Sequence, residues 1–166
     1  RFAKTVLVGF DRCAEHFEGS RRVEVVGTPV RPSVANKPTR EEALEHFGLR
    51  PDCRTVMVMG GSQGARRLNE LVAAGLPAFE ENGVQVLHIS GPRDHEAAQK
   101  AHADHPAAGV LVDFCRDVQY AYAAADLAVC RSGASSLTEL AFYEKPCVLI
   151  PYPYAADDHQ RLNAES

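Results

Sequence analysis

The stretch CRSGASSLTEL, residues 130–140, places small and hydroxylated residues between an apolar run and a helix-like segment. Two kinds of chemistry fit it. Ser136 and Glu139 stand three residues apart, the spacing of a capping box, in which a hydroxyl and a carboxylate accept from backbone N–H groups at a helix start. Alternatively, the small residues let a ligand approach those N–H groups, where the helix dipole favours phosphate. The stretch alone leaves both interpretations open.

Two other polar loops follow apolar runs in the same way. GGSQGAR, residues 60–66, is neither a Walker A loop, because no Gly-Lys-Ser/Thr follows, nor a GxGxxG fingerprint. The loop at residues 153–164 carries polar side chains that precede or open a helix, namely Asp157, Asp158, His159, Gln160 and Asn163. Each loop is weak evidence by itself. Three of them after three apolar runs indicate a shared ligand site.

The elements that must position these loops alternate along the chain. Apolar runs at 54–59, 84–89, 109–114, 126–130 and 147–152 predict strands, and segments at 65–79, 94–102, 117–124 and 136–143 predict helices. Strands without in-and-out alternation, separated by helices, are typical of a parallel sheet covered on both faces. We therefore predict an α/β, doubly wound fold. Ligands of such sheets gather at the carboxyl ends of the strands, so the three loops should meet there.

Composition restricts the function classes. With 166 residues, 45% of them hydrophobic, the chain can bury one sizeable core. A formal net charge of -4 and no visible basic stripe argue against a nucleic-acid partner. No apolar run approaches the roughly 20 residues that span a bilayer. Five scattered cysteines without a CxxC pair favour a reducing compartment and no structural zinc.

The histidines do not predict a metal site. His95, His102 and His105 lie in one segment, but not at the i, i+4 spacing of a helical zinc site, and Glu, Gln and Lys around them indicate a solvated face. His88 lies in an apolar run, where a core or strand-end role is favoured over catalysis. We therefore predict no metal.

The first part of the chain predicts a linker. Pro29, Pro32 and Pro38 disfavour regular structure until Thr39, which with Glu42 forms a second capping-box pattern, and a glycine at position 48 marks the helix end. The chain also starts without methionine at an apolar stretch and stops inside a new helix-like segment. We expect a fragment of a longer protein.

In order and spacing, GTPVR at 27–31, GGSQGAR, CRSGASSLTEL and DDHQRLNA resemble the donor-binding half of the bacterial MurG family, over nearly the whole chain. The resemblance implies a Rossmann-like, doubly wound parallel sheet that forms the C-terminal half of a GT-B glycosyltransferase of family 28. It further implies that residues 1–26 end the N-terminal domain, that 27–38 are the linker, and that 39–166 are the UDP-N-acetylglucosamine (UDP-GlcNAc) binding domain, truncated at its C-terminal end.

Carried over residue by residue, the resemblance implies a donor site. Arg31 would lie near the uracil, the main chain of Cys115 would read the uracil edge, and Glu139 would accept from the ribose hydroxyls. Gln160 and its neighbour His159 would contact the sugar. The full set of predicted UDP-GlcNAc-binding residues is Arg31, Gly61, Ser62, Gln63, Cys115, Arg131, Gly133, Ala134, Ser135, Ser136, Leu137, Thr138, Glu139, His159 and Gln160.

Within that set, Ser62 would bond the diphosphate, and N–H groups from Ala134 onward would hold phosphate. Arg131 is either a fixed cation beside the phosphates or a salt-bridged or exposed residue at a strand end. Gln160 either reads a sugar hydroxyl or only caps the last helix.

The family transfers N-acetylglucosamine from UDP-GlcNAc to lipid I, with inversion, to form lipid II. The resemblance implies that the general base and the lipid-facing surface belong to the N-terminal domain, so this fragment would hold no catalytic residue and would be inactive alone. It implies no cofactor, and a peripheral place on the cytoplasmic side of the bacterial inner membrane, with membrane contact through the missing domain. The alternatives are a subunit of another two-part UDP-sugar transferase and a non-catalytic nucleotide-binding module.

Overall fold

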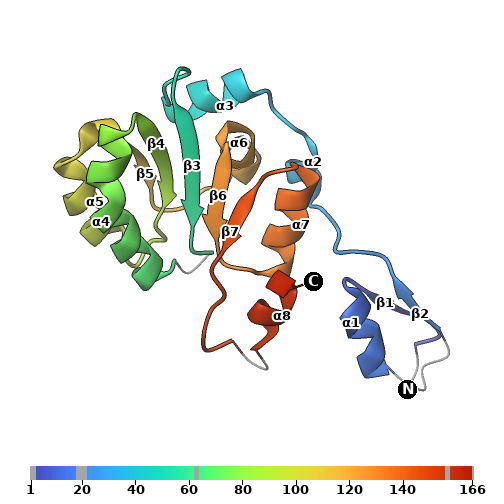
Figure 1. Ribbon diagram of the computed structural model, residues 1–166. Coiled ribbons are helices and arrows are strands. Elements are labelled where there is room, and N and C mark those ends of the chain that lie inside the picture. The colour runs from blue at the N-terminus through green and yellow to red at the C-terminus, as the bar shows by residue number, and fades with distance from the viewer. Residues whose placement is uncertain (1–2, 18–21, 62–63, 156–157, 166) are drawn as a thin grey trace.

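The computed structural model describes residues 3–17, 22–61, 64–155 and 158–165 (Figure 1). These residues form two sheets. A five-stranded sheet carries most of the chain, and a small two-stranded sheet lies near the N-terminus. No helix among the described residues has both the length and the apolar content that crossing a membrane requires.

The larger sheet is entirely parallel, in the order β5-β4-β3-β6-β7 (Figure 1). Its strands are β3 (Arg54–Met59), β4 (Val84–Ile89), β5 (Gly109–Val112), β6 (Leu127–Cys130) and β7 (Cys147–Leu149). From β3 the chain moves outward through β4 to β5, then returns to β6 on the other side of β3. The predicted doubly wound α/β fold is confirmed, and the order reverses between β3 and β6, where such folds open a crevice.

Helices connect these strands. They are α3 (Arg40–Phe47), α4 (Arg66–Glu81), α5 (His95–Ala103), α6 (Val118–Ala124), α7 (Ala134–Phe142) and α8 (His159–Glu165), with a 3-10 turn at Pro106–Ala108. The predicted strands 54–59 and 84–89 have the observed bounds. The three later strands are shorter than their predicted runs, because those runs also included polar residues and Pro151, which lie beyond the ends of the strands.

Alternate residues of β3 point to opposite layers of the core. Met57 packs with Leu87 in the cluster that contains residues of α3, α6 and α7, whereas Val58 packs with Val86 in the cluster of α4. Both faces of the sheet are therefore covered, which explains why the strands are apolar without alternation.

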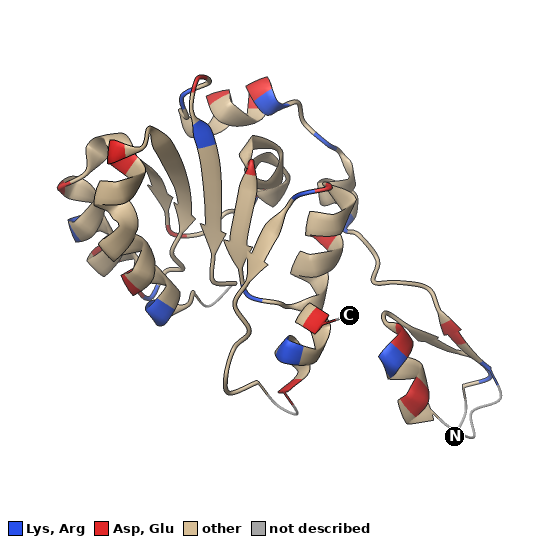
Figure 2. Ribbon diagram, in the orientation of Figure 1, with Lys and Arg blue, Asp and Glu red and all other residues tan. Residues whose placement is uncertain are grey.

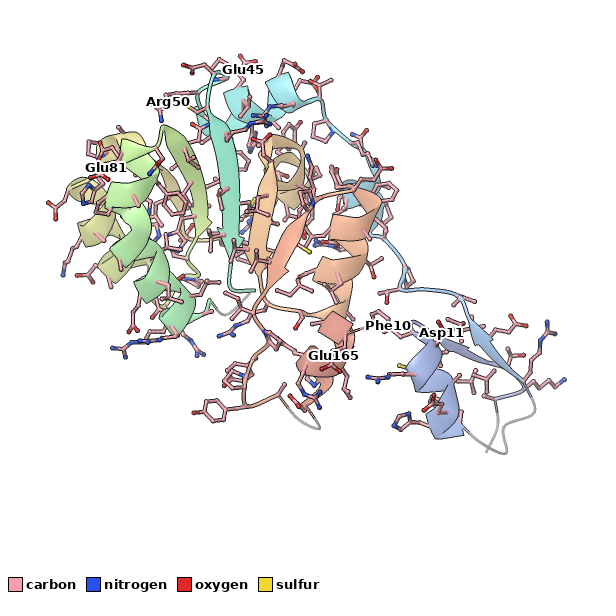
Figure 3. All side chains as sticks on the ribbon, viewed as in Figure 1. Phe10, Asp11, Glu45, Arg50, Glu81 and Glu165 are labelled. Atoms are coloured by element: carbon pink, nitrogen blue, oxygen red, sulfur yellow. The ribbon has the colours of Figure 1, made fainter. Side chains whose placement is uncertain are left out.

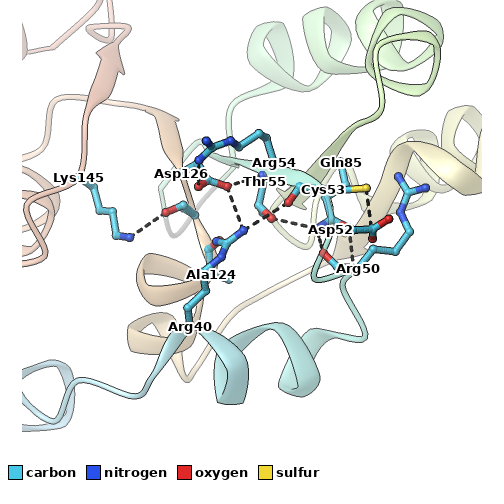
Figure 4. A network of polar contacts seen from close by, with 11 residues as sticks. Arg40, Arg50, Asp52, Cys53, Arg54, Thr55, Gln85, Ala124, Asp126 and Lys145 are labelled. Carbon is cyan, nitrogen blue, oxygen red and sulfur yellow. Dashed lines mark hydrogen bonds and ion pairs between the residues drawn. The ribbon is translucent and has the colours of Figure 1, made fainter.

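The amino ends of β3 and β6 are tied to α3 by a polar network (Figure 4). The Asp126 carboxylate accepts from the N–H of Thr55 at 2.8 Å and from the guanidinium groups of Arg54 at 3.0 Å and Arg40 at 3.2 Å. Burial alone would raise the pKa of Asp126, but these donors lower it below its ordinary value. The network lies at the sheet edge opposite the strand ends that should bind ligand.

The start of α3 confirms a sequence prediction. The Thr39 hydroxyl accepts from the N–H of Glu42, and the Glu42 carboxylate accepts from the N–H of Thr39. Gly48 ends the helix in the left-handed conformation, with φ 66°. This capping box fixes where the main domain begins its first helix.

The prediction that prolines prevent regular structure before Thr39 is wrong in one place. A short helix, α2 (Pro32–Ala35), begins at Pro32, since the first helical position needs no N–H. Val34 of α2 is fully buried in the core of the main domain. Part of the predicted linker, 27–38, is therefore docked on the sheet domain.

Residues before the linker form a separate small unit (Figure 1). It contains β1 (Val6–Val8), α1 (Asp11–Ala14), a 3-10 turn (Glu15–Phe17) and β2 (Val23–Val25), with β1 and β2 parallel. In sequence, the two sheets lie on either side of residues 27–38, and the predicted division at 26 and 39 stays a prediction. The assignment of 1–26 to another domain stays a prediction.

Candidate functional site

Two adjoining cavities lie at the carboxyl edge of the larger sheet. One has a volume of about 370 Å³ and the other of about 750 Å³, and both are lined by Gly61 and Ser136. We call them the small cavity and the large cavity. Gly61 follows β3 and Ser136 follows β6, so the cavities meet where the strand order reverses.

The cavities bring together most of the described residues that sequence reasoning selected. The small cavity is lined by Arg31, Gly61, Cys115, Ser135, Ser136 and Glu139, and the large cavity by Gly61, Arg131, Gly133, Ser136 and Gln160. Ser62 and Gln63 lie outside the described residues, so their predicted roles stay predictions.

The glycine loop after β3 is shaped by contacts that admit no side chain. Gly61 and Gly64 have φ of 92° and 76°, which side chains disfavour. A Cβ on Gly64 would also lie 2.6 Å from the carbonyl oxygen of Ser90, which follows β4. Gly64 is therefore packed tightly against the neighbouring strand end. Gly61 lines both cavities, and Gly64 lines the large one.

Helix α7 begins between the two cavities without a side-chain cap. Its N-cap is Gly133, so Ser136 and Glu139 are the third and sixth helical residues. The capping-box interpretation of this pair is therefore wrong. The N–H of Leu137 donates to the carbonyl of Gly133. The N–H groups of the residues that precede Leu137 have no acceptor within the helix.

Leu137 and Thr138 are not brought to either cavity. The Leu137 N–H is already used, and the Thr138 hydroxyl donates to the carbonyl of Ala134 at 3.0 Å. The predicted phosphate contacts are therefore left to the N–H groups of the first residues of α7, from Ala134 to Ser136, which have no acceptor within the helix. The predicted contacts of Leu137 and Thr138 gain no support.

Glu139 holds a buried ion pair at the small cavity. Its side chain is 5% exposed and accepts from Arg31 Nε at 2.8 Å and Arg31 Nη2 at 3.1 Å, and from the Tyr122 hydroxyl at 2.9 Å. The hydrogen bonds to Glu139 hold the pKa of Arg31 above its ordinary value although burial opposes them. Burial, and then the charge of Glu139, raises the pKa of Tyr122.

These contacts limit what Glu139 can do for a ligand. A carboxylate has about four acceptor positions, and three bonds already reach it. Glu139 can accept one further hydroxyl freely, whereas a second requires Arg31, which is 58% exposed, to share or move. Tyr122, in the predicted helix 117–124, was not selected from the sequence. An aromatic hydroxyl in an alanine-rich buried helix was the signal for its polar role.

Cys115 and Phe114 form another side of the small cavity. Burial, with a contribution from Asp117, raises the pKa of the Cys115 thiol to about 11, so the thiol stays neutral. This agrees with a role for the main chain of Cys115 rather than its sulfur. Phe114 is 51% exposed and was missed, because the sequence analysis placed it inside the predicted strand 109–114, whereas β5 ends at Val112.

Arg131 is fixed at the large cavity by neutral groups. Its Nη1 donates to the carbonyls of Ile150 at 3.0 Å and Pro151 at 2.8 Å, and its guanidinium lies 5.5 Å from the Tyr152 ring centroid. No carboxylate pairs with it within the described ranges, so the salt-bridge alternative is wrong there. The observed contacts orient the group while leaving its charge uncompensated.

The start of α8 is tied to the loop after β6. The Ser132 hydroxyl donates to the carbonyl of Gln160 at 2.6 Å, and Asn163 Nδ2 donates to the carbonyl of Ser132 at 3.1 Å. Gln160 Oε1 accepts from the N–H of Tyr152 at 2.9 Å, so Gln160 does not cap α8. Ser132, fully buried, was missed, although a serine between a strand and a glycine was visible in the sequence.

His159 does not join Gln160 in the large cavity. It lines a third cavity of about 580 Å³, between residues 10–17 and α8, together with Phe10, Phe17 and Leu162. Figure 3 shows Phe10 and Asp11 facing Glu165 across this region. Adjacent residues of a helix point about 100° apart, so the two predicted sugar contacts separate. The prediction that His159 contacts the sugar with Gln160 is not supported.

His88 has the core role that its sequence predicted. It is buried on β4, where its ring contacts Asn69 Oδ1 at 2.9 Å and His102 Nε2 at 3.2 Å. Burial, followed by His102 and His95, lowers the pKa of His88 to about 4. Within the described ranges no group of three or more His, Cys, Asp or Glu side chains could hold a metal ion.

Comparison with known proteins agrees with this geometry. The model of the glycosyltransferase family 28 C-terminal domain matches residues 55–166. The chain is 39% identical over 167 aligned residues to the UDP-N-acetylglucosamine--N-acetylmuramyl-(pentapeptide) pyrophosphoryl-undecaprenol N-acetylglucosamine transferase of Bacteroides fragilis, covering 98% of the chain and 43% of that protein. The transferase of the same name from Nitratidesulfovibrio vulgaris is 46% identical over 142 residues, covering 84% and 38%. The chain thus spans less than half the length of these relatives.

Solved structures show the same relationship. The crystal structure of Acinetobacter baumannii MurG matches with a TM-score of 0.69 and 33% identity, over 98% of this chain and 44% of that one. Phytolacca americana UGT2, complexed with UDP-2fluoro-glucose and pterostilbene, matches with a TM-score of 0.65 at 18% identity, over 98% and 38%, which shows a common fold. Both agree with the predicted C-terminal half of a GT-B glycosyltransferase. The chain belongs to glycosyltransferase family 28, of which residues 55–166 match the C-terminal domain.

Proposed function

We propose that this chain binds the donor UDP-GlcNAc and that the whole protein transfers N-acetylglucosamine from it to lipid I, forming lipid II. The observation that carries the proposal is the uncapped start of α7 between two adjoining cavities at the reversal of strand order. A nucleotide sugar has three parts in a row, and the site offers a compartment for each.

The nucleoside belongs in the small cavity. Phe114 provides an exposed ring on which a base can stack, and the main chain at Cys115 can read its edge. Glu139 has an acceptor position left for a ribose hydroxyl, and Arg31 beside it carries five donors. This arrangement supports a uridine, whose polar edge and diol require both donors and acceptors.

The diphosphate belongs at the start of α7. A helix start presents about half a positive charge and unpaired N–H donors, and Arg131 adds a guanidinium at the large cavity. When the glycosidic bond breaks, the leaving diphosphate gains negative charge. Fixed donors at that position stabilise the transition state more than the ground state.

The sugar belongs in the large cavity beside Gln160. The side-chain oxygen of Gln160 accepts from Tyr152, so its orientation is set, and the amide nitrogen is the group able to donate to a sugar hydroxyl. A site that hydrogen-bonds a hydroxyl rejects sugars that lack it at that position. We therefore assign sugar selectivity to Gln160.

The acceptor and the general base are proposed to belong to parts of the protein beyond this chain, which spans 43% of its Bacteroides fragilis relative. The name of that relative includes a pyrophosphoryl-undecaprenol acceptor, which is membrane-bound. We accordingly propose a peripheral location at the cytoplasmic face of the bacterial inner membrane. No cofactor is proposed, because the donor is already activated by its diphosphate.

Calorimetric titration of the purified chain tests the donor assignment. We expect UDP and UDP-GlcNAc to bind at one site, and ADP to bind at least tenfold more weakly because its base presents a different edge. Competition between UDP and UDP-GlcNAc should be complete. Equal binding of ADP and UDP, or no binding of either, would contradict the proposal.

A further inference from the structure

The carboxylate at the small cavity, Glu139, is held from two sides by groups that differ in burial. Arg31, in the linker, donates to both of its oxygens, but the Arg31 side chain is 58% exposed. Tyr122, on α6, donates to Oε2 at 2.9 Å and is only 1% exposed. An exposed arginine can turn toward an incoming nucleotide, whereas a close-packed core keeps a buried tyrosine in place. Tyr122 is therefore the fixed partner of the carboxylate.

We propose that Tyr122 is a positioning residue for the donor: by holding Glu139 Oε2, it keeps Oε1 directed toward the ribose in the small cavity. The inference rests on the proposed function, which assigns a ribose hydroxyl to Glu139. It adds a residue that determines how strongly the site prefers a nucleotide with ribose hydroxyls to one without them. Tyr122 acts through Glu139, although it lines the same cavity.

The distribution of hydrogen bonds over the two carboxylate oxygens supports this role. Oε2 accepts from Arg31 Nη2 at 3.1 Å and from the Tyr122 hydroxyl, whereas Oε1 accepts from Arg31 Nε alone, at 2.8 Å. An ionised carboxylate oxygen has about two acceptor positions, so the free position is on Oε1. Rotation of the carboxylate would move that position away from the ribose. The bond from Tyr122 opposes this rotation.

Tyr122 is itself fixed by the core around it. Its ring centroid lies 5.4 Å from that of Tyr143 in the same core cluster, and the Tyr143 hydroxyl donates to the carbonyl of Val34 at 3.0 Å. Burial, and then the charge of Glu139, raises the pKa of Tyr122, so its hydroxyl keeps its proton at neutral pH. The hydroxyl is therefore a permanent donor to Glu139.

The neighbouring elements offer Glu139 no charged donor in place of Tyr122. Neither α6 nor β6 carries a Lys, Arg, Asp or Glu residue, and the middle of the larger sheet is also without charged residues (Figure 2). A buried carboxylate that loses a donor keeps the cost of its desolvation. Without the Tyr122 hydroxyl, we expect the carboxylate to turn toward other donors, and the ribose to lose an acceptor that is already oriented.

Calorimetric titration with UDP and with a dideoxy analogue of UDP, which lacks both ribose hydroxyls, tests the inference. We expect the unaltered chain to bind UDP about tenfold more tightly than the analogue, as for one hydrogen bond to a charged group. Tyr122→Phe should weaken the binding of UDP by about fivefold and that of the analogue by less than about twofold. The preference for UDP should therefore fall.

Tyr143→Phe is the matched control, because it removes the same hydroxyl group from the neighbouring ring of the same core cluster. Its hydroxyl bonds a backbone carbonyl rather than Glu139. Both variants should lose stability in urea denaturation, but Tyr143→Phe should keep the preference for UDP over the analogue. A loss of preference in both variants would show that a loosened core, and not the bond to Glu139, causes the effect.

A double substitution tests whether Tyr122 acts through Glu139. Glu139→Gln should by itself remove most of the preference for UDP, so adding Tyr122→Phe should change the ratio of the two dissociation constants no further. A further fall of the same size as in the unaltered background would give Tyr122 a contact of its own and overturn the positioning role.

The remaining outcomes separate this inference from the proposed function. If UDP fails to bind the unaltered chain, the proposed function fails and the inference falls with it. If UDP binds but Tyr122→Phe weakens both nucleotides equally, or neither, the donor assignment stands and the inference is overturned.

A measurement on the unaltered chain keeps the test valid even if Tyr122→Phe does not fold. In the chain labelled with ¹³C at the tyrosine ζ carbons, UDP should shift the Tyr122 resonance more than the dideoxy analogue does, because a ribose hydroxyl then shares the carboxylate with Tyr122. Equal shifts with the two nucleotides would overturn the inference.

Discussion

Replacing the buried carboxylate at the small cavity by its neutral isostere should weaken both folding and nucleotide binding. Glu139 accepts two bonds from Arg31 and one from Tyr122 while only 5% exposed. Glu139→Gln keeps the shape but leaves one acceptor oxygen, and the new amide NH2 faces a donor. The perturbation is therefore electrostatic rather than steric.

The magnitude follows from the number of bonds and their exposure. Glu139→Gln loses at least one bond between charged groups, worth about 1.5–3 kcal/mol where water is excluded. Because Arg31 is 58% exposed, water replaces part of that loss, and we expect a destabilisation of about 1–2 kcal/mol. If Glu139 also accepts from the ribose, UDP affinity should fall by a further factor of about ten.

Urea denaturation and calorimetric UDP titration measure the two effects separately. The matched control is Glu42→Gln, because Glu42 occupies the third helical position of a true capping box, where glutamine also serves. Glu42→Gln should change stability by less than about 0.5 kcal/mol and leave UDP affinity unchanged. If Glu139→Gln behaves like this control, neither the ion pair nor the ribose contact has the importance assigned to it.

Three more perturbations test other parts of the site. Gly64→Ala should lower the free energy of unfolding by more than about 2 kcal/mol, because left-handed strain adds to the 2.6 Å approach to the Ser90 carbonyl. The control Gly27→Ala, with φ 76° and open space around it, should lower it by about 1 kcal/mol. Equal losses in urea denaturation would refute the tight packing at Gly64. The pKa of His88 falls from 6.5 to about 4 on folding, so between pH 6.5 and pH 4 the unfolded chain binds more protons than the folded one. The free energy of unfolding should therefore drop by about 3 kcal/mol as the pH falls through this range. His88→Gln should flatten this dependence of stability on pH, and an unchanged dependence would contradict the assignment. Gln160→Ala should reduce the preference for UDP-GlcNAc over its 4-epimer UDP-GalNAc while UDP binds as before, and an unchanged ratio of dissociation constants would show that Gln160 does not read the sugar.

The sequence predicted the features that depend on neighbours in the chain. The strands at 54–59 and 84–89 are continuous apolar runs between polar residues, and their bounds were correct. The capping box at Thr39 was correct because both partners lie within four residues. The identical spacing of Ser136 and Glu139 was misread, since the helix starts two residues earlier, at Ala134.

The parts that escaped prediction depend on contacts between distant segments. Arg31 reaches Glu139 across 108 positions, and only the fold shows that the carboxylate is already occupied. Ser132 holds α8 through a backbone carbonyl, a contact that requires no particular partner side chain and therefore leaves no sequence pattern. His159 adjoins Gln160 in sequence, but helical geometry directs it to another cavity.

The crystal structure of the chain with UDP-GlcNAc tests the central claim most directly. We predict the uracil against Phe114 in the small cavity, the diphosphate at the N–H groups that open α7, and the sugar beside Gln160 in the large cavity. A nucleotide bound elsewhere, for example in the cavity between residues 10–17 and α8, would contradict the assignment.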